Sequence, residues 1–128
     1  MSNKKLSFSV LPDKLAVCRL EPKDILPDLS AASSFVSITR TQDELSVVCA
    51  ENDLGPEVQC EKGWRCIKVH GPFDFSETGI LSSAVHPLAE AAVPVFAIST
   101  FDTDYLLVKA IDLKAALKVL ADEGHKVF

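Results

Sequence analysis

Polar side chains of a kind that binds ligands are most concentrated in the turn Thr100-Phe-Asp-Thr-Asp104, between two apolar runs of the chain. Aspartate and threonine are common in turns between strands, so a structural role alone would account for them. Phe101 is a second signal, because a large apolar side chain at a loop tip is typical of a surface that something covers. The carboxylates of this turn are acceptors for a cation. We therefore treat the turn as a candidate binding site.

A second candidate is the segment Gly71-Pro-Phe-Asp-Phe-Ser-Glu-Thr-Gly79, which precedes a predicted helix. Its ordinary interpretation is a loop with a serine N-cap and a glycine chosen for close packing. Its functional interpretation is that backbone N–H groups at the helix start receive a carboxylate, with Gly79 letting a ligand approach. In a β-α-β-β unit this loop and the β-β turn can meet at one edge, which would place Glu77 and Ile80 beside residues 100–104. Donors for an anion beside acceptors for a cation form the outline of an amino-acid pocket.

Other residues offer little for catalysis or for metal binding. Asp102 and Asp104 are two positions apart without a glycine-rich phosphate loop, and no spacing suggests a Ser-His or Cys-His pair. None of the four cysteines forms a C-x-x-C pair, and the histidines lack zinc-ligand spacing. We expect no enzyme activity, no metal and no cofactor. Cys18 and Cys49 lie in strand-like runs and are predicted to be buried thiols in a reducing compartment.

Composition and charge limit the binding partners and the cellular location that we expect for this protein. The chain has 128 residues, of which 48% are hydrophobic, and its formal net charge of -5 has the wrong sign for binding nucleic acid. The longest uncharged runs, 78–89 and 91–101, are shorter than the roughly 20 apolar residues that a membrane-spanning helix needs. The stretch from Leu6 to Leu11 alternates apolar residues with serine and reaches Pro12 before the core of a signal peptide develops. We expect a cytoplasmic protein that contacts neither nucleic acid nor membrane.

The spacing of apolar residues predicts two helices that would position these candidates. One has an apolar stripe from Ile80 to Ala89, with Ser76 as N-cap and Pro87 as the place of a bend. The other lies between Asp112, a candidate N-cap, and Gly124, just past its end. Its apolar face carries four residues: Leu113, Ala116, Leu117 and Leu120. Two of the three histidines, His86 and His125, are expected on the surface.

Runs rich in β-branched or aromatic residues predict four strands in the same half of the chain: 64–69, 93–99, 105–109 and 126–128. Together with the helices they give the order β-α-β-β-α-β, the ferredoxin-like pattern of an antiparallel sheet with two helices on one face. A shift of 60 residues places Ile38–Val48 over Ile98–Val108, which indicates an internal repeat. The first copy is predicted to be truncated, with a short helix around residues 24–29 that Pro27 breaks.

Several stretches carry a resemblance to a known family. In the second half these are Thr78-Gly-Ile-Leu, Pro87-Leu-Ala-Glu and Ile98-Ser-Thr-Phe-Asp-Thr-Asp-Tyr-Leu-Leu-Val108. They resemble the small tandem ACT-domain proteins, and residues 11–20 and 35–41 are similar to the first unit of that group. The group is akin to the regulatory domains of aspartate kinase and to the animal cytosolic arginine sensors. The resemblance implies an α+β fold of two ferredoxin-like ACT units, a degenerate one at 1–62 and a complete one at 63–128.

The resemblance also implies a function, that of a non-catalytic sensor with a free amino acid held at an interface between ACT units. A second copy would supply the facing strand end, so a homodimer is expected. The acidic side chains favour a basic amino acid, with arginine ahead of lysine. An alternative is a protein-interaction or regulatory subunit with a vestigial pocket. Carried over by position, the ligand-binding residues are Glu77, Gly79, Ile80, Thr100, Phe101 and Asp104, with His70 at the facing strand end.

The sequence also gives expectations for four further side chains, those of Asp104, Asp102, His70 and Trp64. Asp104 occupies the fixed acidic position of the family's turn and is expected to face the ligand, whereas Asp102 is expected to face solvent. His70 stands where the family has a small residue, so it either contacts the ligand or is a solvated histidine at a strand end. Trp64 opens a strand and is expected in the core.

Overall fold

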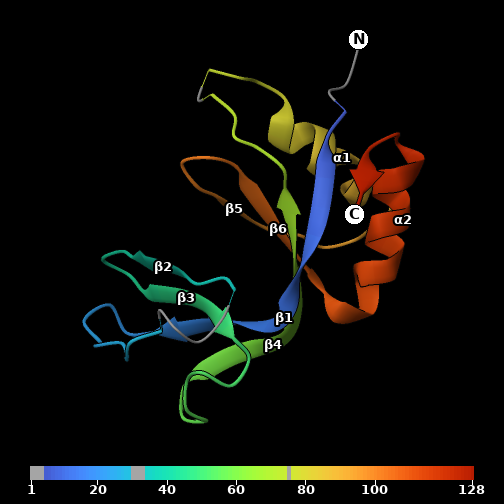
Figure 1. The fold of residues 1–128 in the computed structure, drawn as a ribbon. Helices are drawn as coiled ribbons and strands as arrows, with labels where there is room; N and C mark the ends of the chain where they lie inside the picture. Colours follow the sequence, from blue (N-terminus) through green and yellow to red (C-terminus); the bar gives the residue numbers. More distant parts are fainter. Residues whose placement is uncertain (1–4, 30–33, 75) are drawn as a thin grey trace. The chain divides into compact units, whose positions relative to one another are not determined.

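The computed structural model describes residues 5–29, 34–74 and 76–128, and it divides into two compact units (Figure 1). Unit 1 consists of Met1–Val10 and Arg65–Phe128, and unit 2 consists of Leu11–Trp64. Strands β1 (Ser7–Leu20) and β4 (Gln59–Val69) each contribute residues to both units. The first ten residues therefore belong to the same unit as the C-terminal half. That residues 1–62 form a degenerate ACT unit stays a prediction.

Unit 1 has the predicted order β-α-β-β-α-β from β4 onward. After β4 come α1 (Ile80–Glu90), β5 (Phe96–Ser99), β6 (Asp104–Lys109), α2 (Leu113–Asp122) and β7 (Lys126–Val127). The strands of this unit lie in the order β7-β1-β4-β6-β5, and β5 and β6 form an antiparallel hairpin. The last strand pairs in parallel with β1, where Ser7 lies opposite Lys126 and Phe8 opposite Val127. The N-terminal strand therefore lies between the first and last strands of the ferredoxin-like pattern.

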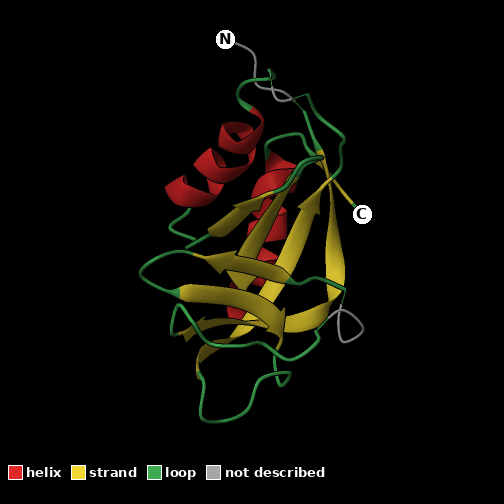
Figure 2. Ribbon diagram, turned by 90° about the vertical axis from the view of Figure 1, so that its left-hand side faces the viewer, coloured by secondary structure: helices red, strands yellow, loops and turns green. Residues whose placement is uncertain are grey.

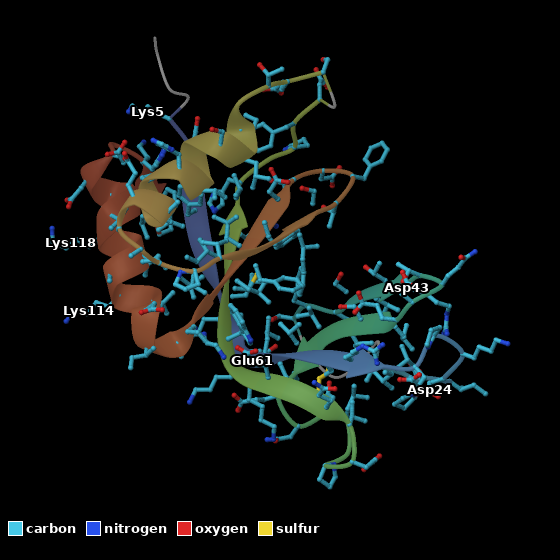
Figure 3. All side chains as sticks on the ribbon, turned by 180° about the vertical axis from the view of Figure 1, so that it is seen from behind. Lys5, Asp24, Asp43, Glu61, Lys114 and Lys118 are labelled. Carbon is cyan, nitrogen blue, oxygen red and sulfur yellow. A yellow bond between two sulfur atoms is a disulfide. The ribbon has the colours of Figure 1, made fainter. Side chains whose placement is uncertain are left out.

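The two helices cover one face of the sheet in unit 1 (Figure 1, Figure 2). Alternate strand residues point to the same face, and Ile67 and Val69 of β4 join Leu106 and Val108 of β6 in one apolar core. The helices contribute five residues to that core: Ile80, Ala84, Leu88, Ala116 and Leu120. On the outer side of α2, Lys114 and Lys118 extend away from the sheet (Figure 3). The ferredoxin-like pattern predicted from the sequence is therefore confirmed for unit 1.

The start of α1 differs from the prediction that Ser76 caps it. The helix begins at Ile80, after Gly79 at a φ of 78°, and among the described residues no side chain makes a cap hydrogen bond. The reason is a separate turn just before it, in which the Glu77 N–H donates to the Asp74 carbonyl oxygen at 3.0 Å. The Asp74 N–H donates in return to Glu77 Oε1, also at 3.0 Å. Ser76 belongs to this turn, so its prediction as the N-cap was wrong.

Unit 2 contains the predicted first hairpin. Strands β2 (Ser37–Arg40) and β3 (Leu45–Ala50) pair antiparallel, and β3 also pairs antiparallel with the second part of β1. Residues 24–29, all described, contain no helix, so that prediction was wrong. Pro22 and Pro27 remove backbone donors on both sides of Asp24, whose N–H instead closes a turn to the Glu21 carbonyl at 3.0 Å. Unit 2 has its own apolar core, around Ala16, Leu45 and Val47 among others.

The cysteines of unit 2 correct another prediction. Cys18 is not a thiol but forms a disulfide with Cys60, with 4.1 Å between the two Cα atoms (Figure 3). The two residues are 42 positions apart in sequence and meet because β1 and β4 are neighbouring strands. Cys49 is a buried free thiol, as predicted, and so is Cys66 in unit 1. Burial raises the pKa of the Cys66 thiol to about 12.

Candidate functional site

A cavity of about 150 Å³ in unit 1 joins the two segments that the sequence singled out. It lies between the loop before α1 and the turn between β5 and β6. Its lining includes Phe73 and Asp74 of the loop and the continuous run of residues 99–104. Five of the seven predicted site residues line it: Glu77, Ile80, Thr100, Phe101 and Asp104. The predicted meeting of loop and turn therefore occurs.

Hydrogen bonds inside the turn hold its shape. The Thr100 N–H donates to the Thr103 carbonyl at 2.8 Å, and the Thr100 hydroxyl donates to the same oxygen at 3.0 Å. Thr103 is buried, and its hydroxyl donates to the Val69 carbonyl at 2.6 Å. This last bond ties the turn to the end of β4. Phe101 remains 79% exposed at the tip, where the sequence predicted it.

The loop before α1 is fixed to the same turn through the backbone. The Phe73 N–H donates to the Asp102 carbonyl at 2.9 Å. Gly71 lies so close that an added Cβ would come within 2.9 Å of the Asp102 carbonyl oxygen and 3.0 Å of Thr103 Cβ. A larger residue at Gly71 would therefore push the loop and the turn apart. The two walls of the cavity are thus held against each other by main-chain contacts.

Carboxylates give the cavity its electrostatic character. Four acidic side chains line it, those of Asp74, Glu77, Asp102 and Asp104, whereas the described lining contains no lysine, arginine or histidine. Asp104 is half-buried and accepts a hydrogen bond from the Ser99 hydroxyl, while Asp102 is exposed. Asp104 is thus the less exposed of the two aspartates, and that it faces a ligand stays a prediction. The arrangement is suited to a cationic ligand.

The start of α1 offers backbone donors next to these acids. The Ser83 N–H donates to the Gly79 carbonyl at 2.9 Å, so the three N–H groups before it in the helix have no acceptor within the helix. Gly79 is outside the cavity lining, but its positive φ is one that glycine adopts without strain. An added Cβ at Gly79 would meet nothing within 4 Å, so the backbone there is open to approach. A carboxylate placed at this end would be favoured by the helix dipole.

His70 does not line the cavity of its own chain. Its Nε2 atom shares a hydrogen bond with the Ser9 hydroxyl, and its ring stacks on Phe128, with the centroids 5.4 Å apart. The backbone N–H of His70 donates to the Ser7 carbonyl oxygen at 2.8 Å. Sequence spacing gave no sign of a serine-histidine pair, because Ser9 and His70 meet only through the placement of β1. No residue of this cluster lies in the lining of the acidic cavity.

His125 is only 6% exposed, so the prediction that it lies on the surface was wrong. Its Nδ1 accepts a hydrogen bond from the Leu6 N–H at 3.0 Å, and its Nε2 lies 3.2 Å from the Ser83 carbonyl oxygen. The ring also contacts Phe8 edge-on, with 5.3 Å between the centroids. Because β1 pairs in parallel with β7, His125 lies next to the N-terminal strand. Trp64, by contrast, is buried as predicted.

Among residues 5–29, 34–74 and 76–128, no three histidine, cysteine or acidic side chains are grouped so that they could hold a metal ion. Within the same ranges, neither helix has the length and apolar character needed to span a bilayer.

Comparison with known proteins relates this geometry to a family. A family model described as an ACT domain matches residues 59–122, and a second one, described as an N-terminal domain, matches residues 13–57. A solved structure from Agrobacterium tumefaciens is 38% identical, with a TM-score of 0.90 over 98% of this chain and 93% of that chain. The regulatory subunit of aspartate kinase from Thermus thermophilus has a TM-score of 0.60 at 11% identity, over 88% of this chain and 93% of that one. The latter likeness shows a common fold alone.

A curated relative adds a named function for a longer protein. The cytosolic arginine sensor for mTORC1 subunit 1 of Bos taurus is 36% identical over an alignment of 100 residues, which covers 70% of this chain and 30% of that protein. The chain therefore spans less than a third of the length of the curated relatives that it matches. The family follows from the ACT domain model, whose match at residues 59–122 spans half of the chain. This chain belongs to the ACT domain family.

Proposed function

We propose that this protein is a non-catalytic sensor that binds a free basic amino acid, with arginine favoured, in the cavity of unit 1. The observation that carries the proposal is the pairing of four carboxylates with the uncapped start of α1 across one cavity. The ligand carboxylate would meet the backbone N–H groups after Gly79. The α-ammonium and the side-chain cation would meet the acidic residues, including Glu77 and Asp104. Arginine is preferred to lysine because its guanidinium makes paired hydrogen bonds with carboxylates.

We also propose that the site is completed in a homodimer. The cavity of one chain has a volume of about 150 Å³ and includes the exposed Phe101 in its wall, so a bound amino acid would keep part of its surface uncovered. Phe101, 79% exposed at the rim, would be buried by whatever closes the site. We expect a second copy to close it, with the strand end at His70 facing the ligand. Binding and dimer formation would then be linked.

The names of similar proteins support a regulatory role in place of catalysis. One structural neighbour is the regulatory subunit of a kinase, and the curated relative is a cytosolic sensor. By the same comparison we propose a cytosolic location. The Cys18–Cys60 disulfide is unusual for a cytosolic protein, which makes its reduction there an expected event.

An alternative function has an observation of its own. Asp104 already accepts a hydrogen bond from Ser99, and Glu77 already accepts one from the Asp74 N–H. These bonds use part of the acceptor capacity that a ligand needs. They favour a protein-interaction or regulatory subunit whose pocket is vestigial. Such a subunit would show no change in stability with any free amino acid.

A thermal-unfolding screen of the twenty amino acids distinguishes the two functions. Arginine at a hundred times its Kd is expected to add about 2.7 kcal/mol to stability and to raise the Tm by several degrees. Light scattering in the same buffer is expected to give the mass of two chains. A shift with leucine or threonine and none with arginine would refute the charge argument. No shift with any amino acid would favour the vestigial pocket, and a monomer under all conditions would refute the shared site.

A further inference from the structure

The disulfide of unit 2 lies beside a cavity that the proposed function does not use. This cavity has a volume of about 590 Å³ and is lined mainly by the loop between β3 and β4, from Asn52 to Pro56, together with Val58, Cys60 and Lys62. Cys60 is partly exposed, whereas its partner Cys18 is only 2% exposed and belongs to the apolar core of the unit. The two bonded cysteines therefore differ in their exposure to solvent. Of the two cysteines, only Cys60 forms part of the cavity wall.

We propose that Cys60 is a site of thiol modification, at which a small anionic thiol of the glutathione class enters this cavity and opens the Cys18–Cys60 disulfide. The thiolate attacks Sγ of Cys60 and forms a mixed disulfide there. The electron pair of the broken bond goes to Sγ of Cys18, which takes a proton from water. A second thiol then attacks the bound one, releasing Cys60 as a thiol and the two small molecules as their disulfide. The two small thiols thus supply the two electrons of the reduction.

Charges on the cavity wall suit a thiol that carries carboxylates. Among the described lining residues, Lys62 is the one cation and Asp53 the one carboxylate. The Lys62 ammonium donates to Asn52 Oδ1 at 3.0 Å, which holds it at the lining. Asp53 is half-buried, with its Oδ2 atom shielded from solvent, whereas Lys62 is exposed and can be reached by an entering carboxylate. Glutathione has more carboxylate than ammonium charge, and Lys62 therefore favours its entry.

The third sulfur of unit 2 does not compete in this exchange. Cys49 is fully buried in the same apolar core as Cys18. Burial raises the pKa of the Cys49 thiol, and the nearby Asp53 carboxylate raises it further. Because the thiolate is the attacking form, Cys49 stays inert while the unit is folded. Exchange is therefore restricted to Cys60 and an external thiol.

Peptide mapping of the native, oxidised protein after exposure to reduced glutathione and acid quenching tests the proposal. The glutathione adduct is expected on the peptide that contains Cys60 and not on those of Cys18, Cys49 or Cys66. In Cys18→Ser the adduct formed with oxidised glutathione should persist, because the thiol that expels glutathione is gone. In Cys60→Ser the buried Cys18 should stay unmodified. Lys62→Gln should slow the reaction of the native protein with glutathione but not with uncharged mercaptoethanol.

Two results would overturn the proposal. One is an oxidised protein that reacts with glutathione only after denaturant has unfolded it. The other is an adduct that appears on Cys18 as often as on Cys60. Failure of any of the three variants to fold would be seen as labelling of Cys49, which is fully buried in unit 2 and serves as the internal control. In that case the mapping of the unsubstituted protein decides alone, since it needs no variant.

Discussion

Phe8→Ala is expected to lower the free energy of unfolding by about 3–5 kcal/mol, the usual cost of deleting a fully buried aromatic ring. Phe8 is 0% exposed and packs in the core of unit 1, with its ring against His125. Phe8 belongs to β1, the strand that lies between β4 and β7 in unit 1. Urea unfolding followed by circular dichroism measures the change.

The matched control for Phe8 is Phe101→Ala in the same unit. Phe101 is 79% exposed, so its truncation should change the stability of the ligand-free protein by less than about 0.5 kcal/mol. Phe8→Leu keeps an apolar side chain and should fall between the two. Equal effects of Phe8→Ala and Phe101→Ala would contradict the placement of the N-terminal strand in unit 1.

Asp104→Asn is expected to weaken arginine binding more than tenfold, which corresponds to about 1.5–3 kcal/mol. The substitution keeps the shape of the half-buried side chain but removes the negative charge that faces the cavity. Stability of the ligand-free protein should change little, because Asp104 is not part of the apolar core. Isothermal titration calorimetry with arginine gives the affinity of each variant.

Asp102→Asn is the matched control, because Asp102 lines the same cavity but is exposed. Solvent screens its charge, so the loss of affinity should be much smaller than at Asp104. Equal losses of affinity would mean that the two carboxylates act on arginine only through their overall negative potential. A larger loss at Asp102 would show that the proposed roles of the two aspartates are reversed.

Local sequence patterns were enough to predict most of unit 1. The apolar stripe from Ile80 and the one from Leu113 each became a helix that packs on the sheet. The turn at residues 100–104 and the loop before α1 also met as predicted, because a ferredoxin-like unit brings them to one edge. In these cases hydrophobic periodicity and short-range connections decide the structure. These elements could therefore be predicted from the sequence without knowing which distant parts of the chain are in contact.

Three features that sequence reasoning missed depend on contacts between distant parts of the chain. Cys18 pairs with Cys60 across neighbouring strands, and His125 is buried because β7 pairs with β1. His70 contacts Ser9 because β1 lies beside β4 in the sheet. Burial and pairing of this kind are set by strand order, which local periodicity does not encode. The helix expected at residues 24–29 failed differently, since Pro22 precedes the segment and Pro27 interrupts it.

Backbone amide NMR during titration with arginine tests the central claim most directly, because it reports where the ligand binds. The account predicts saturable shifts of the amide signals at the start of α1, residues 79–83, and in the turn, residues 99–104. Shifts should also appear at His70, from the facing copy. Saturable shifts confined to unit 2, or no shifts at arginine concentrations that saturate related sensors, would contradict it.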